Sequence, residues 1–159
     1  MGYELRALIT RSDASLDGLG LAVVQRPDGF VLIPLTNDVF DRLGGGDERP
    51  YEEQFGFLSG GIRGLAVQLS RIAPVAYVEV DFFGGAGTQA SIAWRDGEIV
   101  AGPAKHDFES GVDDCPREGW PVNAALAAIG ATVGNANDEF DALHLGQRRE
   151  TDDWLALVS

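Results

Sequence analysis

The stretch VAYVEVDFFGGAGTQASIAWRDGEIVAG, residues 75–102, decides the fold. Apolar side chains recur at every second position on either side of a glycine-rich centre, and this is the period of a β-strand. Asp96-Gly97 then supplies the dipeptide that closes a tight two-residue hairpin. Three consecutive antiparallel strands are therefore predicted over residues 75–102.

The register of the first hairpin is predicted by matching the apolar positions of its two strands. Val80 would lie opposite Ile92 and Val78 opposite Trp94, with residues 84–88 as a five-residue loop. One face would then be apolar. The other face would expose a mixed set of side chains, namely Tyr77, Glu79, Asp81, Phe83, Gln89 and Ser91. Aromatic, charged and hydrogen-bonding groups on one face predict a recognition surface.

The rest of the chain predicts further strands over residues 3–10, 19–26 and 30–35, with a turn at residues 27–29. A helix is expected from Ser59 to the residue before Pro74, another over residues 121–129, and short helical turns over 38–43 and 138–143. Residues 104–119 are expected to form an acidic loop. The predicted fold is one α+β domain over residues 1–159, an antiparallel sheet of about five to six strands with two to three helices packed on one face.

The charge of the chain limits its partners. Twelve Lys and Arg side chains stand against 25 Asp and Glu side chains, a net charge of −13. Such a charge repels nucleic acid and anionic membranes and attracts basic proteins. No apolar run approaches the roughly 20 residues that span a bilayer, and the first residues lack the pattern of a secretory signal. A cytoplasmic protein that binds a basic protein partner is expected.

The candidates for chemistry are few. Glu79 and Asp81, two apart on one strand, share a face at a separation of roughly 7 Å, which is compatible with an acid–base pair. The glycines of residues 84–87 lead into a strand and not into a helix, so they do not form a phosphate loop. Cys115 follows two aspartates, which suppress its thiolate, and neither histidine has the spacing of a metal ligand. No catalytic residue, metal or cofactor is assigned from the sequence.

Two acidic clusters that contain aromatic residues lie in the second half of the chain. Such clusters are typical either of solvated loops or of a surface complementary to a basic partner. The first cluster contains Asp107, Asp113 and Asp114, and the second contains Asp138, Glu139 and Asp141. Together with Tyr77, Glu79, Asp81, Phe83 and Gln89, these residues form the predicted partner-binding set.

Residues 77–90, with Trp94 and Asp96-Gly97 after them, resemble a group of uncharacterised small proteins of actinobacterial type. Residues 138–141 and 151–154 are similar to the C-terminal pattern of that group. Some members resemble cytoplasmic immunity proteins that neutralise polymorphic toxins, so the resemblance implies inhibition by binding. The sequence leaves two other readings open: a small enzyme that uses Glu79 and Asp81, and a component of a bacterial assembly.

Overall fold

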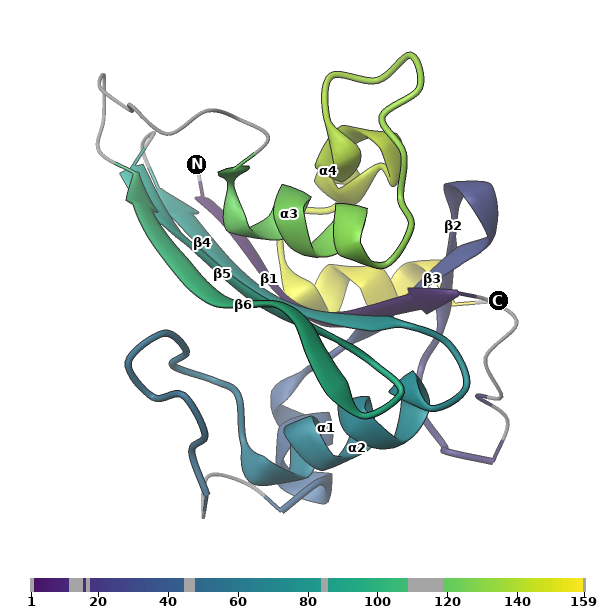
Figure 1. The fold of residues 1–159 in the computed structure, drawn as a ribbon, viewed down its shortest axis with the longest axis vertical. Coiled ribbons are helices and arrows are strands. Elements are labelled where there is room, and N and C mark those ends of the chain that lie inside the picture. The colour runs from purple at the N-terminus through teal and green to yellow at the C-terminus, as the bar shows by residue number, and fades with distance from the viewer. Residues whose placement is uncertain are drawn as a thin grey trace.

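A six-stranded antiparallel sheet divides the molecule, with helices on both sides of it (Figure 1). The computed structural model describes residues 2–11, 16, 18–44, 48–83, 86–108 and 119–158. The strand order is β2-β3-β1-β4-β5-β6, so the first strand lies in the middle of the sheet. The strands are β1 (Gly2–Arg11), β2 (Val24–Arg26), β3 (Phe30–Pro34), β4 (Val75–Phe83), β5 (Ala86–Arg95) and β6 (Glu98–Phe108). The helices are α1 (Asn37–Arg42), α2 (Gly60–Ser70), α3 (Pro121–Ala128) and α4 (Glu139–Ala142), with 3₁₀ segments η1 (Pro27–Gly29), η3 (Leu145–Gln147) and η4 (Thr151–Leu157).

The predicted meander of three strands over residues 75–102 is confirmed as β4, β5 and β6. Arg95 faces Glu98 across the turn, as the sequence predicted. Asp96 and Gly97 have φ angles of 52° and 81°, the left-handed pair that a tight hairpin turn requires. β6 continues to Phe108, so the acidic loop predicted from residue 104 is wrong over its first five residues.

The predicted register between β4 and β5 is wrong by three residues. Tyr77, and not Val80, faces Ile92, and Phe83 faces Ala86. The physical reason is the length of the connection: residues 86–88 pair with β4, and only two residues, outside the described ranges, join the strands. Since three is an odd number, the shift turns the predicted apolar faces of β4 and β5 away from each other.

The helices cover both faces of the sheet, which corrects the prediction that they pack on one face. α2 packs against Tyr77, Ile92 and Trp94, whereas α3 packs against Val78 and Val80 on the opposite face. Two hydrophobic cores result because the middle strands are apolar on both sides. Residues 75–78, for example, are all buried. A sheet with two apolar faces needs a layer of helices on each.

Local signals for the helix ends are largely confirmed. The Ser59 hydroxyl caps α2 by accepting from the Ile62 amide at 3.1 Å. For α1 the cap is Thr36, whose hydroxyl accepts from the Val39 amide at 3.3 Å. No helix within the described ranges is long and apolar enough to cross a membrane.

The first half of β1 extends past the end of β3, and its edge is covered by a segment from the other end of the chain. The Glu4 amide donates to the Arg149 carbonyl at 2.7 Å, and the Arg6 amide donates to the Thr151 hydroxyl at 3.0 Å. These bonds satisfy backbone groups that would otherwise be unpaired at a sheet edge. They also hold Glu4 and Arg6 in place on the sheet.

Candidate functional site

The sheet face that carries α2 is covered over only part of its length. Leu8, Tyr77 and Ile92 form a cross-strand row under α2, and all three are fully buried. The row containing Glu79 and the row containing Asp81 follow along the same strands, beyond the helix. We call the part under α2 the covered half-face and the part beyond it the open half-face.

The open half-face consists of two cross-strand rows of mainly polar side chains and one aromatic residue. Because the registers of β1, β4, β5 and β6 align, each row crosses four strands. The first row is Arg6, Glu79, Ala90 and Lys105, and the second row is Glu4, Asp81, Thr88 and Asp107. Phe83 follows Asp81 by two positions on β4, so it extends the same face toward the sheet end.

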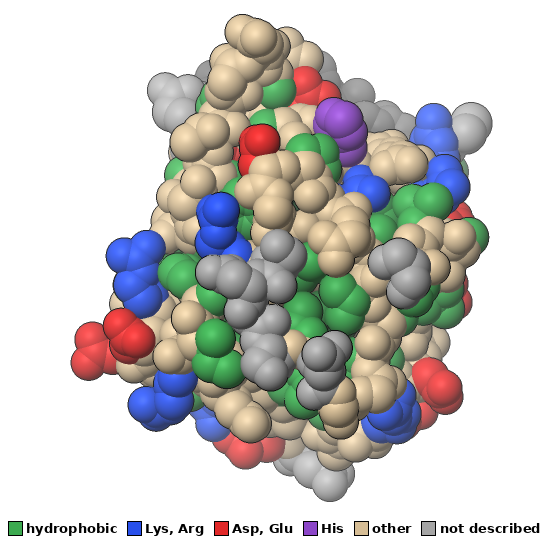
Figure 2. Space-filling view, turned by 90° about the vertical axis from the view of Figure 1, so that its right-hand side faces the viewer, with side chains coloured by type: hydrophobic (Ala, Val, Ile, Leu, Met, Phe, Trp, Pro, Cys, Tyr) green, Lys and Arg blue, Asp and Glu red, His purple; other side chains and the backbone are tan. Residues whose placement is uncertain are grey.

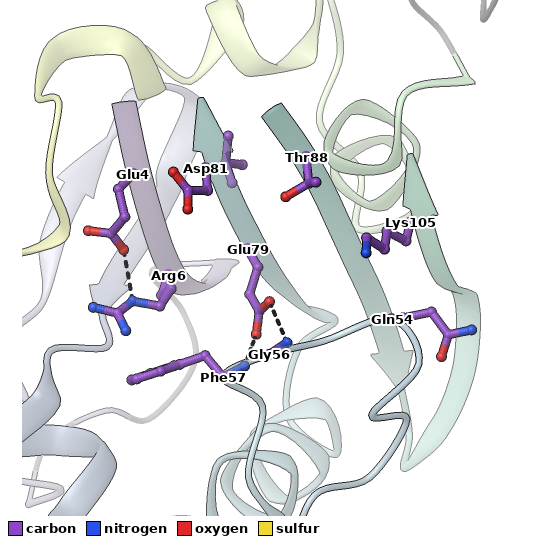
Figure 3. A pocket seen from close by; sticks show the side chains of 10 residues that line it. Glu4, Arg6, Gln54, Gly56, Phe57, Glu79, Asp81, Thr88 and Lys105 are labelled. Carbon is purple, nitrogen blue, oxygen red and sulfur yellow. Dashed lines mark hydrogen bonds and ion pairs between the residues drawn. The ribbon is translucent and has the colours of Figure 1, made fainter. Parts of the chain in front are cut away.

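Part of the open half-face forms the floor of a hollow of about 510 Å³ (Figure 3), whereas Phe83 and Asp107 lie outside its lining. A loop that includes Gln54, Gly56 and Phe57 forms its wall. Figure 3 shows the Asp81 carboxylate between Glu4 and Thr88, with Lys105 projecting from β6. The volume is in the range of small-ligand pockets, and polar and apolar surface contribute about equally to the lining, which is more polar than in most such pockets.

Glu79 anchors the wall to the floor. Its Oε2 accepts from the Gly56 amide at 3.0 Å, and its Oε1 accepts from the Phe57 amide at 2.6 Å and from the Tyr77 hydroxyl at 2.6 Å. Burial of Tyr77, reinforced by the charge of Glu79 and by their hydrogen bond, raises the pKa of the Tyr77 hydroxyl well above its usual value. Three donors on one carboxylate identify Glu79 as a structural anchor.

Arg6 is also committed within the protein. Its Nε donates to the Glu4 carboxylate at 2.8 Å, and its guanidinium carbon lies 3.9 Å from the centre of the Phe57 ring. Glu4 accepts further bonds from the amide and the hydroxyl of Thr151. A carboxylate and an aromatic ring thus hold one arginine from two sides, an arrangement that suits the planar guanidinium.

Asp81 differs from its charged neighbours. Among the described residues it has no hydrogen-bond or ion-pair partner, and its side chain is exposed. The Lys105 ammonium forms its ion pair with the Asp107 carboxylate, at 3.8 Å, and not with Asp81. Asp81 directly faces Glu4, and like charges at opposite positions of neighbouring strands destabilise a sheet. Of the three carboxylates in the second row, Glu4 is paired with Arg6 and Asp107 with Lys105, and Asp81 alone has no cation among the described residues.

The predicted surface on the β4–β5 hairpin is corrected by the new register. Glu79, Asp81 and Phe83 do share the open half-face. Tyr77 is on the same side but fully buried under α2, and Gln89, 7% exposed, lies on the opposite face. The Gln89 side-chain carbonyl accepts from the Val122 amide and so supports the first turn of α3.

The two predicted acidic clusters do not form one surface. Asp107 belongs to the open half-face, whereas Asp113, Asp114 and Cys115 lie outside the described residues. Asp138 is buried and caps α4 by accepting from the Asp141 amide at 2.8 Å. Glu139 and Asp141 belong to α4, which packs with α3 on the opposite side of the sheet from the hollow. On the side seen in Figure 2 the acidic side chains lie apart, mostly near the outline, with basic side chains between them.

Sequence reasoning missed half of the open half-face. Glu4, Arg6, Thr88 and Lys105 were not selected, and neither was the wall residue Phe57. The alternation of β1 does place Glu4 and Arg6 on one side of that strand. No local pattern, however, shows that β1 pairs with β4 so that these residues flank Glu79 and Asp81.

The side chains considered for metal binding and for acid–base chemistry can be compared with the geometry of the site. Across the described ranges, no group of three His, Cys, Asp or Glu side chains is placed to hold a metal ion. Of the two carboxylates considered for catalysis, Glu79 is half-buried and occupied by its three donors, whereas Asp81 is exposed. What the arrangement offers is one unpaired carboxylate, Asp81, near an exposed aromatic ring, Phe83.

Comparisons with protein-family models, with curated proteins and with solved structures gave no match. The function must therefore be argued from the site alone.

Proposed function

We propose that this chain is a binding protein that masks a basic protein partner, of the immunity or inhibitor type, and that the open half-face receives the partner. The observation that carries the proposal is the second row of this surface. Asp81 lies between Glu4 and Thr88, and the row ends in Asp107, with no cation of the chain placed in the row itself. A positive group supplied by a partner would relieve the repulsion within the row.

The net charge of −13 supports the same proposal at longer range. It attracts a basic partner from a distance and speeds the encounter, and salt screens this effect. The mixed character of the open half-face supports it at short range. Arg6 is paired with Glu4 and Lys105 with Asp107, so the Asp81 carboxylate is the acceptor that remains for an incoming positive group.

A direct test is a titration of the ¹⁵N-labelled protein with a twelve-residue peptide of alternating Lys, Arg and Gly, followed by amide chemical shifts. We expect the largest shifts at Glu4, Asp81 and Thr88, and an affinity that falls as ionic strength rises from low to physiological values. Asp81→Asn should weaken binding. Asp152→Asn, which changes an exposed aspartate on η4, is the matched control and should leave binding unchanged.

Two outcomes would contradict the proposal. Shifts spread evenly over the acidic residues would show unspecific attraction, and a binding constant insensitive to salt would exclude electrostatic capture. The immunity assignment has a separate test in the neighbouring gene. If that gene encodes a secreted toxin, the purified toxin should form a complex with this chain and lose its activity, whereas a neighbouring metabolic operon would argue against it.

A further inference from the structure

We propose that the hollow on the open half-face receives one arginine side chain of the partner, with the guanidinium on Asp81 and Thr88, which line the hollow, and its plane against Phe83, which follows Asp81 by two positions outside the lining. This inference rests on the proposed function and specifies the chemistry of the group that is bound. Its starting point is an arginine site that the protein already contains within itself.

Arg6 provides the internal example. The Glu4 carboxylate binds its Nε at 2.8 Å, and the Phe57 ring lies against its guanidinium at 3.9 Å. Asp81 and Phe83 repeat this pairing of a carboxylate with an aromatic ring on the neighbouring strand. In their case no arginine of the described chain occupies the place between them.

The acceptors next to the hollow match a guanidinium. Asp81 and Thr88 are directly opposite each other on β4 and β5, so their Cβ atoms are about 5 Å apart. Neither side chain has a hydrogen-bond partner among the residues that the structure describes. A guanidinium carries five N–H donors in a planar fork, which allows two bonds to one carboxylate and a third to a neighbouring hydroxyl.

Phe83 supplies the surface for the plane of the guanidinium. Its side chain is 76% exposed, the largest exposure among the large apolar residues described. It lies two positions beyond Asp81 on the same face, at a distance of about 7 Å along the strand. The ring of Phe57 cannot serve a guest in the same way, because Arg6 lies on one of its faces and Phe40, at 4.5 Å between centroids, packs against it as well.

Arginine fits this site better than lysine. An ammonium group would find the same charge at Asp81, but it offers a compact point charge, which is more strongly hydrated and has no plane to place on Phe83. The hollow of about 510 Å³ leaves room for the backbone that carries the arginine. Asp81 is exposed and Thr88 is half-buried, and both line the hollow.

The test uses three short peptides on the full chain: acetyl-Gly-Gly-Arg-Gly-Gly-amide and the same peptide with lysine or citrulline in place of arginine. Binding is measured by ¹⁵N chemical-shift titration at low ionic strength. We expect the arginine peptide to bind at least threefold more tightly than the lysine peptide. The citrulline peptide, which keeps the shape and loses the charge, should give no saturable shift.

Variants separate the three contacts. Asp81→Asn should abolish saturable binding of the arginine peptide, and Phe83→Leu should weaken it about two- to fivefold, the range of an exposed cation–π contact. Thr88→Val should weaken binding of the arginine peptide more than it weakens binding of the lysine peptide. Asp152→Asn is the control for charge, and because Phe83 is so exposed, its replacement should leave the fold and the amide spectrum elsewhere unchanged.

The outcomes distinguish this inference from the proposed function. Equal affinity for arginine and lysine peptides, with no effect of Phe83→Leu, would overturn the arginine site and leave a general cation surface. Arginine binding that is retained in Asp81→Asn would place the site elsewhere and overturn it as well. If neither charged peptide nor the twelve-residue basic peptide shifts the open half-face, both the inference and the proposed function are wrong.

Discussion

The covered and the open half-face lie on the same strands, a few residues apart, and they differ in burial, in charge and in the element that covers them. In the covered half, Leu8, Tyr77 and Ile92 are fully excluded from solvent beneath α2. In the open half, Glu79 and Asp81 continue β4 with the same alternation, but their neighbours are charged and a loop replaces the helix as the wall. The comparison shows how one regular sheet supplies both a core and a binding surface.

The boundary between the halves is a single pair of residues. Tyr77 belongs to the core by its ring and reaches Glu79 by its hydroxyl at 2.6 Å, and Glu79 in turn holds the loop that borders the hollow. The shape of the open half therefore depends on the packing of the covered half. Four predictions test this dependence.

The largest effect is expected from Ile92→Ala, in the covered half. Removal of a fully buried side chain under α2 should lower the free energy of unfolding by about 2–5 kcal/mol, because it leaves a cavity in a packed core. Denaturant unfolding measures it. The matched control is Ile99→Ala on the next strand, where the side chain is 42% exposed and the loss should be less than half as large. Equal losses would mean that α2 does not cover the sheet as described.

Glu79→Gln tests the boundary from the open side. The amide keeps the size of the side chain but offers its NH₂ to a position where three donors converge, so at least one donor loses its acceptor. We expect a loss of about 1–3 kcal/mol in the free energy of unfolding. The Phe57 amide should exchange faster with solvent than in the native protein. Unchanged exchange at Phe57, measured by hydrogen exchange, would show that Glu79 does not anchor the wall.

Tyr77→Phe removes only the hydroxyl at the boundary and is expected to cost about 1 kcal/mol at neutral pH. The native protein should also lose stability in alkali. Because burial raises the pKa of Tyr77 in the folded state above the unfolded value of about 10, the stabilisation is complete below pH 10 and is lost as the pH rises above it. Tyr3 behaves in the same direction, since burial also raises the pKa of its hydroxyl.

The measurement is the free energy of unfolding between pH 8 and the highest pH at which the fold persists. The slope above pH 10 should be shallower in Tyr77→Phe than in the native chain, by up to about 1.4 kcal/mol per pH unit. A native slope that matches that of Tyr77→Phe would contradict the buried, neutral state of this tyrosine.

The smallest effect is expected from Asp81→Asn, and its sign is opposite. Loss of the charge that faces Glu4 should raise the free energy of unfolding by about 0.2–1 kcal/mol, while the same change weakens the binding of a basic peptide. The gain should shrink in high salt, because salt screens exposed charges. A variant that is less stable than the native chain would show that Asp81 has a favourable partner in the free protein.

Much of the fold could be predicted from local patterns. The tight turn at Asp96-Gly97, the apolar stripe of α2 with its Ser59 cap, and the alternation of the strands each depend on a few neighbouring residues, and each is confirmed. The register of β4 against β5 could not be predicted in this way. Apolar residues stand on both sides of β4, at Tyr77 as well as at Val78, so the sequence pattern is compatible with either face pointing to a given helix.

The candidate site was predicted only in part, because the strand register also decides which side chains share its face. Glu79, Asp81 and Phe83 were identified together because they alternate along one strand. Gln89 was assigned to their face only through the mistaken register, and the structure places it under α3 instead. Arg6, Thr88 and Lys105 come from three other strands, and their approach to Asp81 depends on pairings that span most of the chain.

By itself, the amino-acid sequence determined the class of the fold, the three-stranded meander, the main helices and the strongly negative charge, because these depend on composition and on periodicity over a few residues. Only the tertiary structure decided which side chains share a face, that helices cover both sides of the sheet, and that Asp81 stands without a described partner between Glu4 and Thr88. The physical reason is that strand register and long-range pairing bring together residues as distant as Glu4 and Asp107, and this is set by how the two cores pack and not by any local pattern.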